Sequence, residues 1–213
     1  MKLDKSSMLL YAVTDSMWLE GRSLALQVEE AIRAGVTFVQ LREKNLEFDQ
    51  FVKLAKEIKA VTDAYNIPFV INDNPDVALA CDADGIHIGQ QDMAAGMVRE
   101  KIGRDKILGV SAQTVEQAVL AQKNGADYLG VGAVFTTSTK EDAAAVSYDT
   151  LKEICNAVDI PVVAIGGINR QNMLDLSGSN IAGVAVVSAI FAQKDLTAAT
   201  RELRLLAEKT VNL

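Results

Sequence analysis

Short apolar runs alternate with longer amphipathic stretches along the whole chain of 213 residues. The apolar runs are rich in valine and isoleucine, which is typical of parallel strands that are covered on both faces. They predict strands at Leu9–Val13, Phe38–Leu41, Phe69–Ile71, Gly85–Ile88, Ile107–Val110, Tyr128–Val131, Val162–Ile165 and Val184–Val187.

The amphipathic stretches between these runs predict helices at Leu24–Ala34, Phe48–Ala64, Pro75–Cys81, Val98–Ile102, Val115–Asn124 and Leu151–Ala157. Two of the helices have clear start signals. Asn74 is a predicted N-cap with proline at the first helical position, and Thr114 is a predicted N-cap with Gln117 three residues on. The repeating unit is therefore a strand followed by a helix.

About eight such units in a chain of this length favour a (β/α)8 TIM barrel that occupies residues 1–213 as one domain. An open doubly wound sheet uses the same alternation and is the alternative. No G-x-G-x-x-G follows the first predicted strand, and nothing marks a second lobe. The pattern therefore favours the barrel.

Composition and charge narrow the class of protein. A hydrophobic content of 49% with 23% charged residues is typical of a soluble protein with a large core. The net charge of -7 argues against nucleic acid and membrane surfaces as partners. No apolar run is long enough for a membrane span or a signal peptide, and Cys81 and Cys155 are isolated. We expect a cytoplasmic protein; a homo-oligomer is compatible with the sequence, which leaves the oligomeric state open.

Two carboxylates follow neighbouring predicted strands. Asp73 comes directly after the third strand and Asp92 follows the fourth. Because parallel strands end at the same edge of a sheet, both acids should emerge there, and their convergence indicates a divalent cation.

A phosphate site is predicted after the last two strands. Gly166 and Gly167 expose backbone N–H groups that no side chain blocks, and Ser188 precedes the last helix, whose N-terminus attracts anions. A tight turn is the alternative explanation of the glycine pair, but the matching serine favours the phosphate site, which is common at this edge of such barrels.

A second anion site is indicated by Arg42, Lys44, Ser111 and Lys140 beside the two carboxylates. Surface salt bridges between these charges are the alternative. Mg²⁺ accounts for both signs of charge, because it takes one or two carboxylates together with phosphate oxygens while Arg and Lys contact the remaining oxygens. The strand ends therefore predict one monophosphate and one metal-bound polyphosphate that face each other.

Motifs along nearly the whole chain carry a resemblance to a known family. They are Val39–Lys44, Ile71–Asp73, Ala83–Asp92, Leu108–Ser111, Thr137–Lys140, Ile165–Ile168 and Val186–Ser188. In this order and at these spacings the chain resembles the thiamine-phosphate synthases, also called thiamine-phosphate pyrophosphorylases.

The resemblance implies a (β/α)8 barrel that joins hydroxymethylpyrimidine diphosphate to thiazole phosphate, giving thiamine phosphate and pyrophosphate. It implies that Asp73 and Asp92 bind Mg²⁺ and that Arg42, Lys140 and Ser111 are catalytic. The implied pyrimidine diphosphate site consists of Gln40, Leu41, Arg42, Glu43, Lys44, Asn72, Ser111 and Lys140. The implied thiazole phosphate site consists of Thr137, Ser138, Thr139, Gly167, Val187 and Ser188.

The chain departs from the family pattern at two places. Ala133 and Thr136 replace the usual prolines of the long loop before Ser147, so we expect a floppier loop when the site is empty. Gln113 stands where many relatives have histidine. The related thiazole tautomerases use a histidine in that region, so its absence argues against a tautomerase-like isomerase. A phosphate-ligand sensor without catalysis is the other alternative.

Two further side chains are not expected to take part in the chemistry directly. His87 is the only histidine and lies inside a predicted strand, so we expect it to pack and not to act as a base. Glu43 lies between Arg42 and Lys44, where alternation turns it away from them, so we expect an orienting role.

Overall fold

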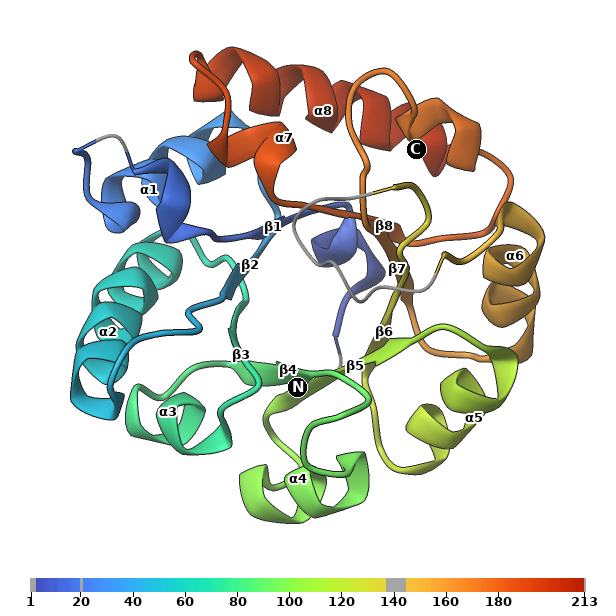
Figure 1. The fold of residues 1–213 in the computed structure, drawn as a ribbon, viewed down its shortest axis with the longest axis horizontal. Coiled ribbons are helices and arrows are strands. Elements are labelled where there is room, and N and C mark those ends of the chain that lie inside the picture. The colour runs from blue at the N-terminus through green and yellow to red at the C-terminus, as the bar shows by residue number, and fades with distance from the viewer. Residues whose placement is uncertain (1–2, 20, 137–144, 213) are drawn as a thin grey trace.

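Eight parallel strands close into a barrel, and helices form a ring around it (Figure 1). The computed structural model describes residues 3–19, 21–136 and 145–212. The strands are β1 (Leu10–Val13), β2 (Phe38–Leu41), β3 (Phe69–Asn72), β4 (Gly85–Ile88), β5 (Ile107–Ala112), β6 (Tyr128–Val131), β7 (Val162–Ile165) and β8 (Gly183–Val186). The first strand pairs with both the second and the eighth, which confirms the predicted (β/α)8 barrel and excludes the open sheet.

The helices lie between the strands in sequence. They are α1 (Leu24–Ala34), α2 (Phe48–Ala64), α3 (Pro75–Ala80), α4 (Ala95–Ile102), α5 (Val115–Lys123), α6 (Tyr148–Ala157), α7 (Ser188–Phe191) and α8 (Leu196–Thr210), with 3-10 turns η1 (Lys5–Met8), η2 (Ser16–Trp18) and η3 (Met173–Leu176). Within the ranges described, no helix is long and apolar enough to cross a membrane.

Both predicted N-caps are confirmed. The Asn74 side chain accepts hydrogen bonds from backbone N–H groups of the first turn of α3, and Pro75 opens the helix. The Thr114 hydroxyl accepts from the N–H of Gln117 at 3.3 Å. The Gln117 side chain accepts from the N–H of Gln113, one residue before the cap, so the reciprocal bond of a capping box is shifted by one residue.

Several strand ends differ from the prediction by one or two residues. β5 continues through Ser111 and Ala112, because these pair with Gly130 and Val131 of β6. β8 ends at Val186, since the next residue is the N-cap of α7. Pairing with the neighbouring strand, or the start of the next helix, therefore decides the strand ends that hydrophobicity alone leaves ambiguous.

The core consists of two layers that are separated by the barrel wall. Outward side chains such as Leu41, Ile71 and Ile86 pack beneath the helices. Inward side chains, among them Tyr11, Phe38 and Tyr128, fill the barrel itself. The rings of Tyr11 and Phe38 lie 4.5 Å apart between centroids. Because residues alternate between the two layers, each strand has a fixed set of inward positions, and those nearest its carboxyl end face the candidate site.

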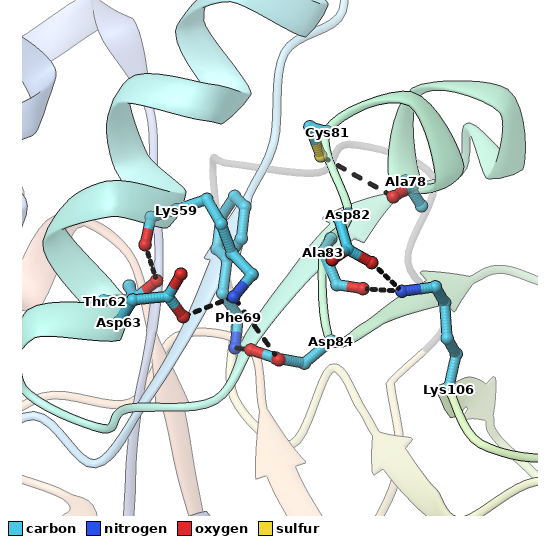
Figure 2. Close-up of polar contacts among 10 residues, drawn as sticks. All are labelled: Lys59, Thr62, Asp63, Phe69, Ala78, Cys81, Asp82, Ala83, Asp84 and Lys106. Atoms are coloured by element: carbon cyan, nitrogen blue, oxygen red, sulfur yellow. Dashed lines mark hydrogen bonds and ion pairs between the residues drawn. The ribbon is translucent and has the colours of Figure 1, made fainter.

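The amino end of β4 is fixed by charged side chains (Figure 2). An Asp84 carboxylate oxygen accepts a hydrogen bond of 2.8 Å from the N–H of Phe69, the first residue of β3. Lys59 of α2 lies 3.6 Å from the same carboxylate and also pairs with Asp63. Lys106 donates to the Ala83 carbonyl at 2.7 Å. These contacts lie at the end of the barrel opposite the strand carboxyl ends, where side chains contribute to stability.

We expect Asp84→Ala to lower the free energy of unfolding by about 2 kcal/mol, because the N–H of Phe69 loses its partner. Asp63→Ala is the matched control: it removes an exposed partner of the same lysine and should cost about 0.5 kcal/mol or less. Urea denaturation of both variants measures the difference. Equal losses would show that the backbone hydrogen bond contributes nothing beyond the ion pairs.

Candidate active site

A cavity of about 340 Å³ opens at the carboxyl end of the barrel. Every one of the eight strands, or the loop that follows it, contributes to its wall. The predicted site residues that line it are Gln40, Arg42, Lys44, Asn72, Asp73, Asp92, Ser111, Gly167, Val187 and Ser188. The structure therefore brings these described residues of the two predicted anion sites into one cavity.

Two of the remaining predicted residues do not line the cavity, and four are not described. Leu41 is fully buried in the layer between barrel and helices, because its position on β2 alternates outward. Glu43 accepts a hydrogen bond from the Ser16 hydroxyl and does not line the cavity. Thr137, Ser138, Thr139 and Lys140 are outside the residues that the structure describes.

Asp73 adopts a left-handed backbone conformation directly after β3, with φ of 63°. Aspartate and asparagine tolerate this conformation better than other residues with a side chain. The N–H of Asp73 donates to the His87 carbonyl at 2.8 Å, and its carboxylate accepts from the Asn72 amide at 2.5 Å. The turn therefore places this carboxylate at the rim of the cavity.

Asp92 is held by the loop that follows β4. One of its carboxylate oxygens accepts a hydrogen bond of 2.6 Å from the N–H of Gly89. A Cβ at residue 89 would lie 3.0 Å from that oxygen, so glycine allows the close approach. Both predicted metal ligands thus line one cavity, and their oxygen atoms suit a hard divalent cation.

Protein ligands alone do not complete a metal site here. Nowhere in the described ranges do three or more His, Cys, Asp or Glu side chains gather in a way that could hold a metal ion. Mg²⁺ often keeps only one or two carboxylates and takes its other ligands from water and substrate phosphate. Two carboxylates beside an anion site fit that arrangement.

The positive side of the cavity comes from the end of β2. The N–H of Arg42 donates to the buried Thr14 hydroxyl at 3.1 Å, and the N–H of Thr14 donates to the Gln40 carbonyl at 2.9 Å. Neither Arg42 nor Lys44 forms an ion pair with any residue that the structure describes. Their charge is therefore available to an anionic ligand.

The opposite arc of the rim carries the glycine turn. Gly166 and Gly167 both have positive φ, at 100° and 67°. The amides of Asn169 and Asn172 donate to the Gly167 carbonyl at 3.1 and 2.9 Å, which fixes the orientation of that peptide. Ser188 begins α7, so its N–H makes no bond within that helix. Among the described residues, this arc offers backbone donors and no charged side chain.

The floor of the cavity is a chain of buried polar side chains. The Gln40 amide donates to the Tyr11 hydroxyl at 2.5 Å, and the hydroxyls of Tyr11 and Tyr128 lie 2.8 Å apart. His87 places Nδ1 3.0 Å from the Tyr128 hydroxyl and Nε2 3.0 Å from the Ser111 hydroxyl. Burial raises the pKa of both tyrosine hydroxyls, so they stay protonated.

Sequence reasoning missed this floor. His87 is largely buried, as expected for a packing residue, yet it also lines the cavity and contacts a predicted catalytic residue. The available signal was the inward alternation that Tyr11, His87 and Tyr128 share with Gln40 and Ser111. Gln113, at the departure from the family pattern, also lines the cavity and donates to the Gly132 carbonyl at 3.3 Å.

Comparisons with known proteins agree on one family. Residues 10–190 match the family described as thiamine monophosphate synthase. The thiamine-phosphate synthase of Clostridium tetani is 57% identical over 91% of this chain and 93% of that protein. The thiamine-phosphate synthase of Ruminiclostridium cellulolyticum is 54% identical over 91% of this chain and 92% of that protein. A solved structure of thiamine phosphate pyrophosphorylase from Pyrococcus furiosus has a TM-score of 0.90 at 38% identity and covers 97% of this chain and 98% of that one.

We expect Gly167→Ala to weaken the binding of inorganic phosphate roughly tenfold or more, because a Cβ there would lie 2.4 Å from the Thr136 carbonyl oxygen and force the turn to shift. Gly103→Ala is the matched control. Its φ is also positive, at 77°, but nothing lies within 4 Å of the added Cβ. Titration followed by ³¹P NMR compares the two variants, and similar phosphate binding in both would contradict a phosphate site at the glycine turn.

Proposed function

This chain belongs to the thiamine monophosphate synthase family and makes thiamine phosphate in thiamine biosynthesis, and we propose how its cavity does so. The two substrates are hydroxymethylpyrimidine diphosphate and thiazole phosphate, and the products are thiamine phosphate and pyrophosphate. One observation carries the proposal. A single cavity has cationic side chains, which pair with no acid among the described residues, beside two carboxylates on one arc and a glycine turn with backbone donors on the other.

The diphosphate occupies the arc formed by β2 to β5. Arg42 and Lys44 contact its oxygens there, and the Ser111 hydroxyl reaches it from β5. Lys140 is predicted to add a further positive charge. Asp73 and Asp92 would hold Mg²⁺, which neutralises charge on the diphosphate and makes pyrophosphate a better leaving group.

The thiazole phosphate occupies the other arc. Its phosphate accepts hydrogen bonds from the backbone at Gly167 and Ser188. The apolar side chains of Val163, Ile165 and Ile168, on β7 and directly after the glycine turn, line the cavity and provide a surface for the aromatic rings. The two substrates thus bind with their reactive atoms directed toward each other.

The reaction is a substitution at the methylene carbon of the pyrimidine. The bond from this carbon to the diphosphate oxygen breaks, and pyrophosphate leaves with both electrons. The thiazole nitrogen then uses its lone pair to form the new C–N bond with the pyrimidine-methyl cation. This chemistry needs no protein nucleophile, so the residues act by stabilising the leaving anion electrostatically and by aligning the two rings.

The cation must be protected from water, which would convert it to an alcohol. The barrel floor and the apolar wall exclude water from below.

The alternatives have less support. A tautomerase or sugar-phosphate isomerase needs one phosphate site and an acid–base pair. This cavity has cationic side chains on one arc and backbone donors on the other, and Gln113 lines it in the region where tautomerases use histidine. A sensor would bind the same ligands without turnover. Relatives that are more than half identical over most of the chain are synthases, which favours catalysis.

We expect pyrophosphate release to require both substrates and to stop when a chelator removes divalent metal. A coupled assay for pyrophosphate measures this with each substrate alone, with both, and with both plus chelator. Release that continues in chelator would contradict the metal role. Binding of both ligands without any release would favour the sensor.

We expect Asp73→Asn to raise the Mg²⁺ concentration needed for half-maximal rate roughly tenfold or more, because one ligand charge is lost. The fold should be unaffected, since asparagine tolerates the left-handed backbone. Asp73→Ala is the matched comparison: it should show the same metal defect and also lose about 1–2 kcal/mol of unfolding free energy. A normal Mg²⁺ requirement in Asp73→Asn would remove this residue from the metal site.

A further inference from the structure

The polar floor of the cavity is a continuous line of hydrogen bonds from β2 to β5. It begins at Gln40, passes through Tyr11, Tyr128 and His87, and ends at Ser111. Its first and last members belong to the predicted substrate site. The three between them belong to the barrel interior and are at most 9% exposed.

The orientation of the Gln40 amide, with its nitrogen toward Tyr11, sets the direction of the hydrogen bonds along this line. The Gln40 nitrogen can only donate, so the Tyr11 oxygen accepts from it and the Tyr11 hydrogen goes to Tyr128. The hydrogen of Tyr128 then goes to Nδ1 of His87. A neutral imidazole that accepts at Nδ1 carries its hydrogen on Nε2 and donates it to the Ser111 oxygen. The hydrogen of Ser111 is left to point elsewhere, and Ser111 lines the cavity.

We propose that Tyr128 and His87 are positioning residues that turn the Ser111 hydroxyl into a hydrogen-bond donor toward the cavity. Tyr128 donates to Nδ1 and so holds His87 as the tautomer with hydrogen on Nε2. His87 then donates to the Ser111 oxygen. The consequence for catalysis, a donor aimed at the leaving diphosphate, rests on the proposed function. The tautomer itself is a property of the protein alone.

Packing holds the two rings in place. A Cβ at residue 109 would lie 2.2 Å from the Tyr128 ring, and a Cβ at residue 130 would lie 3.0 Å from Cε1 of His87. Gly109 and Gly130 therefore provide the space that these rings fill, and the rings have little room for other orientations. The raised pKa values of Tyr11 and Tyr128 keep one hydrogen on each hydroxyl.

If the hydrogen bonds ran the other way, from Ser111 toward Gln40, the Ser111 hydroxyl would have the opposite role. This direction requires the Gln40 oxygen to face Tyr11, each tyrosine to donate toward Gln40, and His87 to carry its hydrogen on Nδ1. Ser111 would then donate to His87 and could only accept from a ligand. The two directions thus differ in which ring nitrogen of His87 carries the hydrogen.

One NMR measurement decides between them, because His87 is the only histidine of the chain. Protein with ¹⁵N-labelled histidine gives one ring signal set in a long-range ¹H–¹⁵N correlation spectrum, recorded without ligands at neutral pH. We expect a neutral ring with hydrogen on Nε2. Hydrogen on Nδ1, or on both nitrogens, would overturn the proposal.

Two variants test whether Tyr128 sets the tautomer. Tyr128→Phe removes the donor to Nδ1, so we expect a mixture of both tautomers. Tyr11→Phe is the matched control, because it removes a hydroxyl oxygen from the neighbouring ring. The hydrogen bond between Tyr128 and His87 is left in place, so Nε2 should stay protonated. An unchanged tautomer in Tyr128→Phe would overturn the positioning role.

Kinetics then separate positioning from mere structural support. We expect kcat to fall about tenfold in Tyr128→Phe, because the donor acts on charge that grows as the diphosphate leaves. In Tyr11→Phe the defect should appear mainly in KM for the pyrimidine substrate, because Gln40 loses its partner. An unchanged kcat in Tyr128→Phe would overturn the role in catalysis. Lack of synthase activity in the unmodified chain would instead overturn the proposed function and leave the NMR result intact.

Discussion

Closure of the barrel is the constraint on which the rest of the structure depends. The first strand pairs with the eighth as well as with the second, so every strand has a partner on both sides and all carboxyl ends meet at one rim. Closure also fixes the inward and outward sets of side chains, because a shift by one residue would exchange them. Residues that are distant in sequence, such as Arg42 and Ser188, thereby line the same cavity.

The proposed substitution reaction depends on where the charged groups lie around the rim of the cavity. Cationic side chains and carboxylates lie together on one arc, while the other arc has backbone donors at a glycine turn. In the proposed function, a diphosphate with its metal and a monophosphate therefore bind in one cavity without competing for the same groups. A substitution with a good leaving group requires little else from the protein, which explains why no residue is assigned as a nucleophile.

The strands and most of the described residues at the rim could be predicted from the sequence. Buried parallel strands leave continuous apolar runs, and polar residues directly after them mark the rim, so Asp73, Arg42 and Gly167 were found from position alone. Leu41 was included because motif residues were carried over as a continuous block, although alternation on β2 turns it outward. His87 was expected to pack, and its contacts with Tyr128 and Ser111 depend on cross-barrel distances that one strand cannot reveal. The roles of the residues from Thr137 to Lys140 stay predictions.

The central claim is that one cavity holds the diphosphate with its metal on one arc and the thiazole phosphate on the other. A crystal structure of the chain with Mn²⁺, pyrophosphate and thiamine phosphate tests this most directly, because anomalous scattering locates the metal. The account predicts metal bound by Asp73 and Asp92, pyrophosphate contacting Arg42 and Ser111, and the thiamine phosphate group at Gly167 and Ser188. Metal bound away from both carboxylates, or a phosphate group away from the glycine turn, would contradict it.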